Sequence, residues 1–208
     1  MTDTENGAAG VSFADGEHVC VFYRGPGERD AFLREWVGAG FAAGDKCLCV
    51  AGAADAAAMA DSLQAGAPAP PRPDQLTVLP VARYLTDGSF VPEATFARWD
   101  ALIGGYVGDG FERVRGVGDL SWVLDAGEPA DPSRTGPLLR YEALCNTLVG
   151  RHPVSIACMY DLDRFGADVV AAVLDQHSAV LAGGVLFRAD RPRCAGEAAA
   201  EAEAPELA

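Results

Sequence analysis

His18-Val-Cys-Val-Phe-Tyr-Arg-Gly-Pro-Gly-Glu-Arg-Asp30 is the stretch that decides the fold, because an apolar strand-like run passes through glycine and proline into a charged helix-like segment. A phosphate-binding loop has this layout, and its pattern G-x-x-x-x-G-K-[S/T] supplies backbone amides, a lysine and a hydroxyl for phosphates and magnesium. No lysine follows the turn here, and Glu28 places a negative charge where a phosphate would sit at the helix N-terminus. The stretch therefore predicts a nucleotide-binding architecture that has lost its nucleotide, so ATP and magnesium are not expected as cofactors.

Strand-like and helix-like segments alternate along the rest of the chain. Short apolar runs predict strands, and apolar positions spaced three and four residues apart predict helices. The predicted strands are 19–23, 46–51, 76–79, 113–117, 154–159 and 185–187, and the predicted helices are 28–43, 54–65, 92–107, 138–149 and 165–181. Gly44 is expected to cap the first helix, and 66–74, 84–90 and 127–136 are predicted loops. Apolar strands that alternate with helices predict a three-layer α/β fold, with a mostly parallel sheet covered on both faces.

Length and composition indicate one domain. The chain has 208 residues, of which 50% are hydrophobic, enough for a stable core in a single α/β unit. We expect this unit to cover 13–193. Residues 1–12 are small and polar and 194–208 are mostly alanine and glutamate, so both are predicted to be solvated tails.

Charge and hydropathy exclude two classes of partner. The net charge is −14 and the basic residues are scattered singly, which disfavours a nucleic-acid surface. No apolar run approaches the roughly 20 residues that span a bilayer, and the first residues lack the basic region of a signal peptide. The sequence predicts a cytoplasmic protein without a membrane or nucleic-acid partner.

The six cysteines form no C-x-x-C pair, and their neighbours are mostly apolar. In a cytosolic chain this pattern favours buried thiols over disulfides. His18 and Cys20 lie two residues apart on a predicted strand, so they share one face and are candidate metal ligands. The competing interpretation, favoured by the sequence alone, is that strand cysteines are small core residues.

Polar and aromatic side chains gather where the predicted strands end. In open α/β sheets, ligands bind beyond the carboxyl ends of the strands. These ends carry Tyr23 and Arg24 after the first strand, Asp119 and Trp122 after the fourth, and Tyr160 and Asp161 after the fifth. Each residue also has a structural interpretation, with Trp122 in the core and the aspartates as caps. As a group they predict a pocket.

Two further residues lie on apolar helix faces. Glu142 flanks the stripe formed by Leu138, Cys145 and Val149, where a carboxylate needs a partner or an altered pKa. Its candidate partners are Arg24, Arg29 and Arg164. His177 falls on the apolar face of the last predicted helix, where a satisfied core histidine is commoner than a ligand or base. Because no G-x-S-x-G or H-E-x-x-H pattern is present, the sequence favours a non-enzymatic role.

Taken together, these motifs resemble the MEDS family, a sensory domain named after methanogen and methylotroph regulators and the dichloromethane-responsive regulator. The resemblance covers roughly 18–187, nearly the whole predicted domain, and the order of the motifs makes it fairly specific. The matching passages are His18–Tyr23 with the following Gly-Glu-Arg, Phe41–Lys46, Val117–Trp122, Leu139–Glu142, Cys158–Phe165 and Leu174–His177.

The resemblance implies a degenerate relative of RecA- and KaiC-like ATPases that senses small organic molecules. In actinobacteria, members of the family accompany anti-sigma-factor kinases or their antagonists, and the alanine- and glycine-rich composition is compatible with such a source. Unlike the multidomain members, this chain is expected to carry no kinase, STAS or DNA-binding module. We therefore expect its signal to pass through another protein, an anti-sigma factor or a STAS-type regulator.

The first hypothesis is a stand-alone regulatory domain that binds a small, largely apolar organic ligand, stacked on aromatic side chains. The loops 86–92 and 125–137 are the expected moving parts. The predicted ligand-binding residues are Tyr23, Arg24, Glu28, Asp119, Trp122, Glu142, Tyr160, Asp161, Arg164 and His177.

Two alternatives stay open. One is an enzyme of secondary metabolism or a nucleotide-binding protein on the same fold, with Asp119, Glu142 and His177 as acid, base or metal ligands. The other is a protein-binding module that uses its acidic surface and tail. The sequence does not decide whether the chain forms a homodimer.

Overall fold

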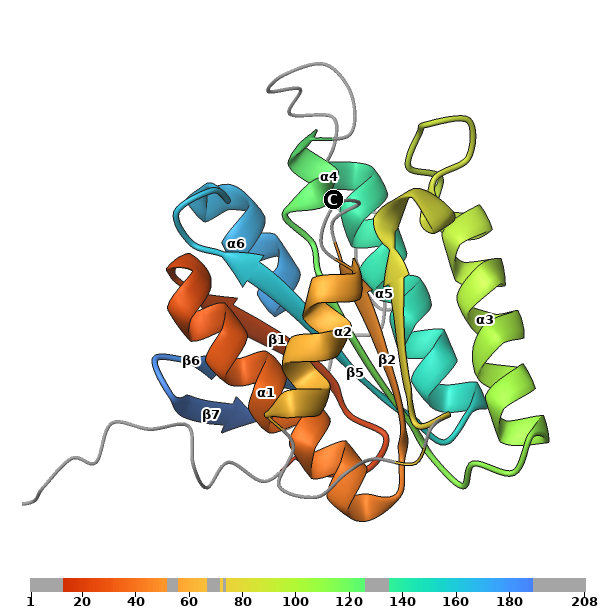
Figure 1. The fold of residues 1–208 in the computed structure, drawn as a ribbon. Coiled ribbons are helices and arrows are strands. Elements are labelled where there is room, and N and C mark those ends of the chain that lie inside the picture. The colour runs from red at the N-terminus through yellow and green to blue at the C-terminus, as the bar shows by residue number, and fades with distance from the viewer. Residues whose placement is uncertain (1–12, 52–55, 67–71, 73, 126–134, 189–208) are drawn as a thin grey trace, which may run out of the picture.

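In the part of the chain that the structure describes, seven strands form one sheet in the order β3-β2-β4-β5-β1-β6-β7 (Figure 1). The structure is a computed structural model that describes residues 13–51, 56–66, 72, 74–125 and 135–188. All neighbouring strands run parallel except β7, which is antiparallel to β6. The strands are β1 (His18–Tyr23), β2 (Lys46–Ala51), β3 (Leu76–Pro80), β4 (Val114–Asp119), β5 (Val154–Asp161), β6 (Ala179–Ala182) and β7 (Val185–Arg188).

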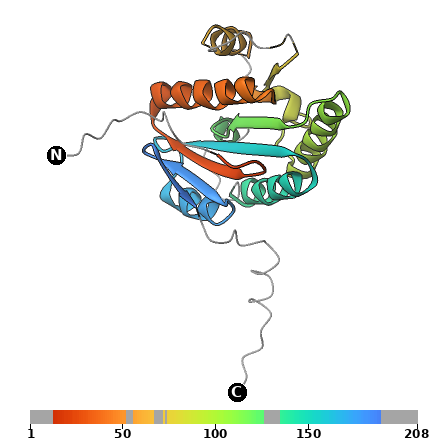
Figure 2. The ribbon, with the colours of Figure 1, turned by 90° about the horizontal axis from the view of Figure 1, so that it is seen from below.

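Helices cover both faces of the sheet, which confirms the predicted α/β fold (Figure 2). On one face, α1 and α2 pack against the sheet, and on the other face α3, α5 and α6 do so. The helices are α1 (Gly25–Ala43), α2 (Ala56–Ala65), α3 (Pro92–Gly108), α4 (Trp122–Asp125), α5 (Thr135–Arg151) and α6 (Ala167–Leu174), with a 3-10 turn at Val81–Tyr84. None of the described helices is long and apolar enough to cross a membrane.

Successive side chains of β1 point to opposite faces of the sheet, so they pack into two different cores. Val19, Val21 and Tyr23 pack with α1 and α2, whereas Cys20 and Phe22 join the core beneath α3, α5 and α6. His18 has the same parity as Cys20, so it also faces α5. The predicted common face of His18 and Cys20 is therefore present, and it is fully buried.

Helix α1 begins three residues earlier than predicted, because Glu28 caps it. The Oε2 atom of Glu28 accepts the backbone N–H of Arg24 at 2.7 Å, and Gly25 turns the chain with φ +66°. Pro26 fits the first helical turn, where its missing N–H has no cost. A carboxylate thus already lies at the N-terminus of α1, where a phosphate-binding loop would hold an anion.

Gly44 ends α1 in the left-handed conformation, with φ +78°, as predicted. A side chain in this conformation costs about 1–2 kcal/mol, so we expect Gly44→Ala to lower the free energy of unfolding by that amount. Gly105 is the matched control, because it lies on the exposed face of α3, where an added methyl group would meet no atom within 4 Å. Gly105→Ala should raise the stability by about 1 kcal/mol. Urea denaturation measures the stability of both variants. If both substitutions changed the stability in the same direction and by the same amount, the left-handed conformation assigned to Gly44 would be contradicted.

The predicted helix 165–181 is wrong in its second half. Helix α6 ends at Leu174, and Ala179–Ala182 forms strand β6, which pairs with β1 inside the sheet. The apolar residues of the segment have a helical spacing, but the last four alternate between buried and half-buried positions with the period of a strand. His177 consequently lies in the connection between α6 and β6, not on a helix.

Smaller differences concern the loops and ends. Helix α5 begins at Thr135, so Gly136 is helical, where a loop was predicted. Most of the predicted loop 127–136, like most of the loop 125–137 expected to move, lies outside the described residues, and so do the residues of both predicted tails.

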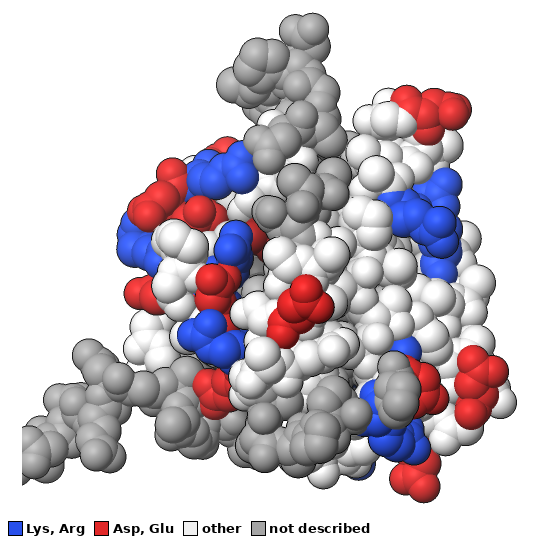
Figure 3. All heavy atoms as spheres, in the orientation of Figure 1, with Lys and Arg blue, Asp and Glu red and all other residues white. Residues whose placement is uncertain are grey.

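On the face covered by α1 and α2, basic and acidic side chains lie interspersed over α1 (Figure 3).

Candidate functional site

A cluster of titratable side chains is sealed between the sheet and α5. Glu142 on α5 is 0% exposed, and its Oε2 atom lies 3.0 Å from Nε2 of His18 on β1. The same oxygen lies 3.2 Å from Nε2 of His177. The hydroxyl of Tyr160 on β5 donates a hydrogen bond to the other carboxylate oxygen, Oε1. Three separate parts of the chain therefore meet at one carboxylate.

The other nitrogen of each imidazole identifies its tautomer. Nδ1 of His177 lies 2.7 Å from the carbonyl oxygen of Val173, which can only accept, so this nitrogen carries a hydrogen. Nδ1 of His18 lies 3.0 Å from Oδ1 of Asn146, and the Asn146 amide group donates to the Gln176 carbonyl at 2.9 Å. That bond directs Oδ1 toward His18. If neutral, both imidazoles therefore present a lone pair at Nε2.

The contacts at Glu142 Oε2 are close but do not have hydrogen-bond geometry. Among the described residues, neither this oxygen nor Nε2 of His177 has a hydrogen-bond partner. Burial raises the pKa of Glu142, but His177 and His18 outweigh it and hold the pKa well below its usual value. Burial and the neighbouring His177 lower the pKa of His18. The carboxylate is thus ionised, and the His18 imidazole tends toward its neutral form.

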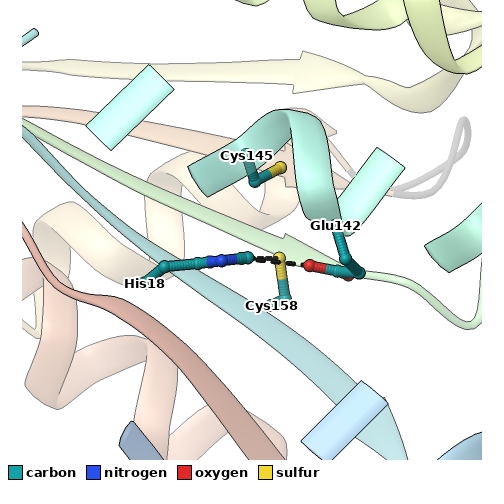
Figure 4. A group of neighbouring side chains, drawn as sticks. All are labelled: His18, Glu142, Cys145 and Cys158. Atoms are coloured by element: carbon teal, nitrogen blue, oxygen red, sulfur yellow. Dashed lines mark hydrogen bonds and ion pairs between the residues drawn. The ribbon is translucent and has the colours of Figure 1, made fainter. Parts of the chain in front are cut away.

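Two thiols complete the cluster (Figure 4). The Sγ atom of Cys158 on β5 lies 3.4 Å from Nε2 of His18, and Cys145 lies one turn after Glu142 on α5. The potential ligand atoms of His18, Glu142, Cys145 and Cys158 all lie within 4.8 Å of one another. Cys20 is buried nearby, and its pKa is raised by burial and by Glu142, but it does not belong to this group.

A second site is an open pocket of about 370 Å³ at the carboxyl ends of β2 and β4, which we call the strand-end pocket. Its wall combines apolar side chains with three arginines and two aspartates. The lining residues are Arg29, Asp30, Leu33, Arg34, Val50, Ala51, Ala58, Met59, Ser62, Leu63, Asp119, Ser121, Trp122 and Arg164.

Asp119, Trp122 and Arg164 are the predicted residues that line this pocket. Asp119 is held at the end of β4 by the Tyr23 hydroxyl, which donates to it at 2.8 Å, and by the backbone N–H of Ser121 at 2.9 Å. Burial raises the pKa of Tyr23, so its hydroxyl stays protonated and able to donate. Trp122 meets Phe90 edge to face, with ring centroids 5.1 Å apart.

Of the other predicted residues, Tyr23 contacts Asp119, and the rest do not line the strand-end pocket. Glu142, Tyr160 and His177 belong to the sealed cluster on the α5 side of the sheet. Arg24 pairs with Asp163 at an exposed position, and Asp161 accepts the N–H of Asp163 at 3.0 Å, as a turn cap does. The predicted single pocket is thus divided between two sites.

The predicted arginine partners of Glu142 are wrong. Arg24 pairs with Asp163 and Arg29 with Asp30, and Arg164 lines the strand-end pocket. The true partners come from β1, β5 and the α6–β6 connection, which the sequence does not show to be adjacent. Cys145 and Cys158 were not predicted as part of the site. The spacing of Glu142 and Cys145, three residues apart on one helix face, was a signal that could have found the first.

The sequence model of the MEDS family, described as the MEthanogen/methylotroph, DcmR Sensory domain, matches residues 17–178. The matched segment runs from the start of β1 to the α6–β6 connection, so it contains both sites described above. A comparison with curated proteins found no match. The family match covers most of the chain and confirms the resemblance seen in its motifs. This chain belongs to the MEDS family of sensory domains.

Proposed function

We propose that this domain senses a small organic molecule with an apolar body and an anionic end, which binds in the strand-end pocket. Membership of a sensory family supports the signalling role. The observation that carries the ligand class is the wall of this pocket of about 370 Å³, which combines three arginines with apolar side chains. That volume lies near the lower end of the range of about 300–1,000 Å³ for ligand pockets, which favours a small molecule.

The anionic end follows from the arginines. A guanidinium group binds a carboxylate through two parallel hydrogen bonds, more strongly than neutral partners bind each other. Arg29 already pairs with Asp30 at 2.9 Å. Arg34, one helical turn after Asp30, lines the pocket and has no ion pair among the described residues. Arg34 is therefore the best-placed cation for the anionic end, and Leu63 and Trp122 offer apolar surface for the rest of the ligand.

The route of the signal begins at Trp122. This side chain lines the pocket and contacts Phe90, which lies in the loop that leads into α3. A ligand changes an equilibrium only through different affinities for the two states. In this proposal, a ligand that packs on Trp122 alters the contact with Phe90 and shifts the loop 86–92.

The output surface proposed for a partner protein is the edge strand β7. Its side chains Val185 and Phe187 are 53% and 57% exposed, although they are large and apolar. Edge strands offer unpaired backbone groups to another chain, and exposed apolar side chains strengthen such pairing. Both features support a protein partner, for which an anti-sigma factor or a STAS-type regulator remains our proposal.

The nucleotide alternative has less support. Glu28 bonds the backbone N–H of Arg24 and puts a negative charge at the start of α1, where a nucleotide phosphate would need positive potential. The mixed signs of charge over α1 likewise offer no basic stripe for a nucleic acid on that face.

Thermal melting with matched probe pairs tests the proposal. We expect hexanoate and benzoate to raise the melting temperature of the protein, and hexanol and benzyl alcohol to have much smaller effects. Because a charge-assisted hydrogen bond contributes about 1.5–3 kcal/mol, Arg34→Ala should weaken carboxylate binding about 10- to 100-fold. Trp122→Ala should also abolish the response while the protein stays folded.

Arg140→Ala is the control, because Arg140 is an exposed arginine on α5 that pairs with Glu93, away from the pocket. It should respond to carboxylates as the wild type does. Equal shifts by acids and alcohols, or an unchanged affinity in Arg34→Ala, would contradict the proposed ligand class.

A further inference from the structure

Three electron-pair donors converge on one point inside the sealed cluster: Nε2 of His18, Nε2 of His177 and Oε2 of Glu142. Oε2 of Glu142 lies 3.0 Å from Nε2 of His18 and 3.2 Å from Nε2 of His177. The hydrogens on both Nδ1 atoms turn the Nε2 lone pairs inward. Lone pairs at such distances repel each other unless a proton or a cation lies between them, and two of the three atoms have no hydrogen-bond partner among the described residues.

We propose that His18, His177 and Glu142, together with Sγ of Cys158, bind a divalent transition metal of the zinc class. Two imidazoles, one carboxylate and one thiolate are a donor set that Zn²⁺ accepts in tetrahedral geometry. With bonds of about 2.0–2.3 Å, neighbouring donors in a tetrahedron lie roughly 3.2–3.8 Å apart. The observed 3.0, 3.2 and 3.4 Å separations are close to this range, so binding needs only small movements.

Three of the proposed ligands have outer hydrogen-bond partners of the kind that orient the ligands of metal sites. Ligand imidazoles normally donate their second N–H to a carbonyl or carboxylate, which orients the ring. His18 donates to Asn146 and His177 to the Val173 carbonyl, while the Tyr160 hydroxyl holds the outer oxygen of Glu142. Each of these three proposed ligands therefore has an outer partner in place.

Charge balance also supports a cation here. The cluster is fully buried, so a net charge would be costly. One carboxylate and one thiolate balance a divalent cation. The thiol of Cys158 carries a proton that it must lose to bind a metal as a thiolate. The metal would take the place of this proton, which leaves to solvent on binding.

His177 is assigned as the fourth ligand in preference to Cys145. The Nε2 atom of His177 has no hydrogen-bond partner among the described residues, whereas the thiol of Cys145 interacts with Cys158. Cys145 and Cys20 are then neighbours of the site that do not bind the metal, which makes them matched controls for Cys158. The metal site does not depend on the ligand proposed for the strand-end pocket.

Cobalt substitution tests the site on the full chain. Because the cluster is sealed, Co²⁺ is supplied in the growth medium, and the metal content of the purified protein is measured by elemental analysis. We expect one cobalt per chain, the strong visible bands of four-coordinate Co²⁺, and a near-ultraviolet charge-transfer band from the thiolate. Native mass spectrometry of protein grown with Zn²⁺ should show one bound zinc.

The variants assign the ligands. Cys158→Ser should lose the charge-transfer band, whereas Cys145→Ser and Cys20→Ser should keep it. His177→Ala should reduce metal retention at least 10-fold, with folding checked by circular dichroism. A wild-type protein that holds neither metal, a charge-transfer band that survives in Cys158→Ser, or full metal retention in His177→Ala would overturn the proposal.

Discussion

Replacing Glu142 by alanine is expected to lower the free energy of unfolding by about 3–5 kcal/mol, the range found when one partner of a buried ionic cluster is removed. The carboxylate is 0% exposed and lies between the imidazoles of His18 and His177, whose ring centroids are 4.1 Å apart. Its removal leaves the Tyr160 hydroxyl without its acceptor and the two imidazoles without the carboxylate that lies between them. It also opens a cavity between α5 and β5.

Glu142→Gln removes the charge of the side chain but keeps its volume, so it shows how much of the loss comes from the charge. The amide fills the same space, can accept from Tyr160 and can donate one N–H to an imidazole lone pair, so we expect a smaller loss of about 1–3 kcal/mol. Urea denaturation of both variants, monitored by circular dichroism, measures the difference. If the alanine variant lost less than about 1 kcal/mol, the carboxylate would make no net contribution to the folded state.

Much of the fold could be predicted because its strands are apolar runs with clear boundaries. Lys46–Ala51 was predicted to the residue, and the other strands of the parallel core within one or two residues at each end. The exception is β6. Its four residues continue the helical spacing of α6, and only their pairing with β1 makes them a strand. A helix and a buried strand of this length have the same local pattern.

The two sites differ in how far the sequence reveals them. Asp119 and Trp122 follow a strand, so the rule that ligands bind at carboxyl ends placed them at the strand-end pocket. The sealed cluster depends on the strand order β5-β1-β6, which brings His18 beside Cys158 and the α6–β6 connection. No local motif encodes that order. A single buried glutamate indicated that a partner exists, but not that it is a pair of histidines.

Asp45→Ala is expected to have the second large effect on stability, about 3–5 kcal/mol. Asp45 follows the cap of α1, and its side chain is only 4% exposed. It accepts a hydrogen bond from Arg113 at 2.9 Å and one from Arg115 at 3.2 Å. Arg115 is 11% exposed, and its guanidinium lies 4.9 Å from the ring of Trp36. Without Asp45, a largely buried cation loses its only carboxylate partner among the described residues.

The double variant Asp45→Ala with Arg115→Met shows whether this loss comes from the unpaired cation. Methionine preserves much of the apolar stem that packs near Trp36 and removes the charge. If the unpaired charge is the cause, the double variant should be more stable than Asp45→Ala alone, because a buried ion pair replaced by apolar groups is often neutral in stability. Arg113 is 39% exposed and can be solvated, so it should contribute little. Additive losses in the double variant, measured by urea denaturation, would show that the effect of Asp45→Ala does not come from an unpaired Arg115.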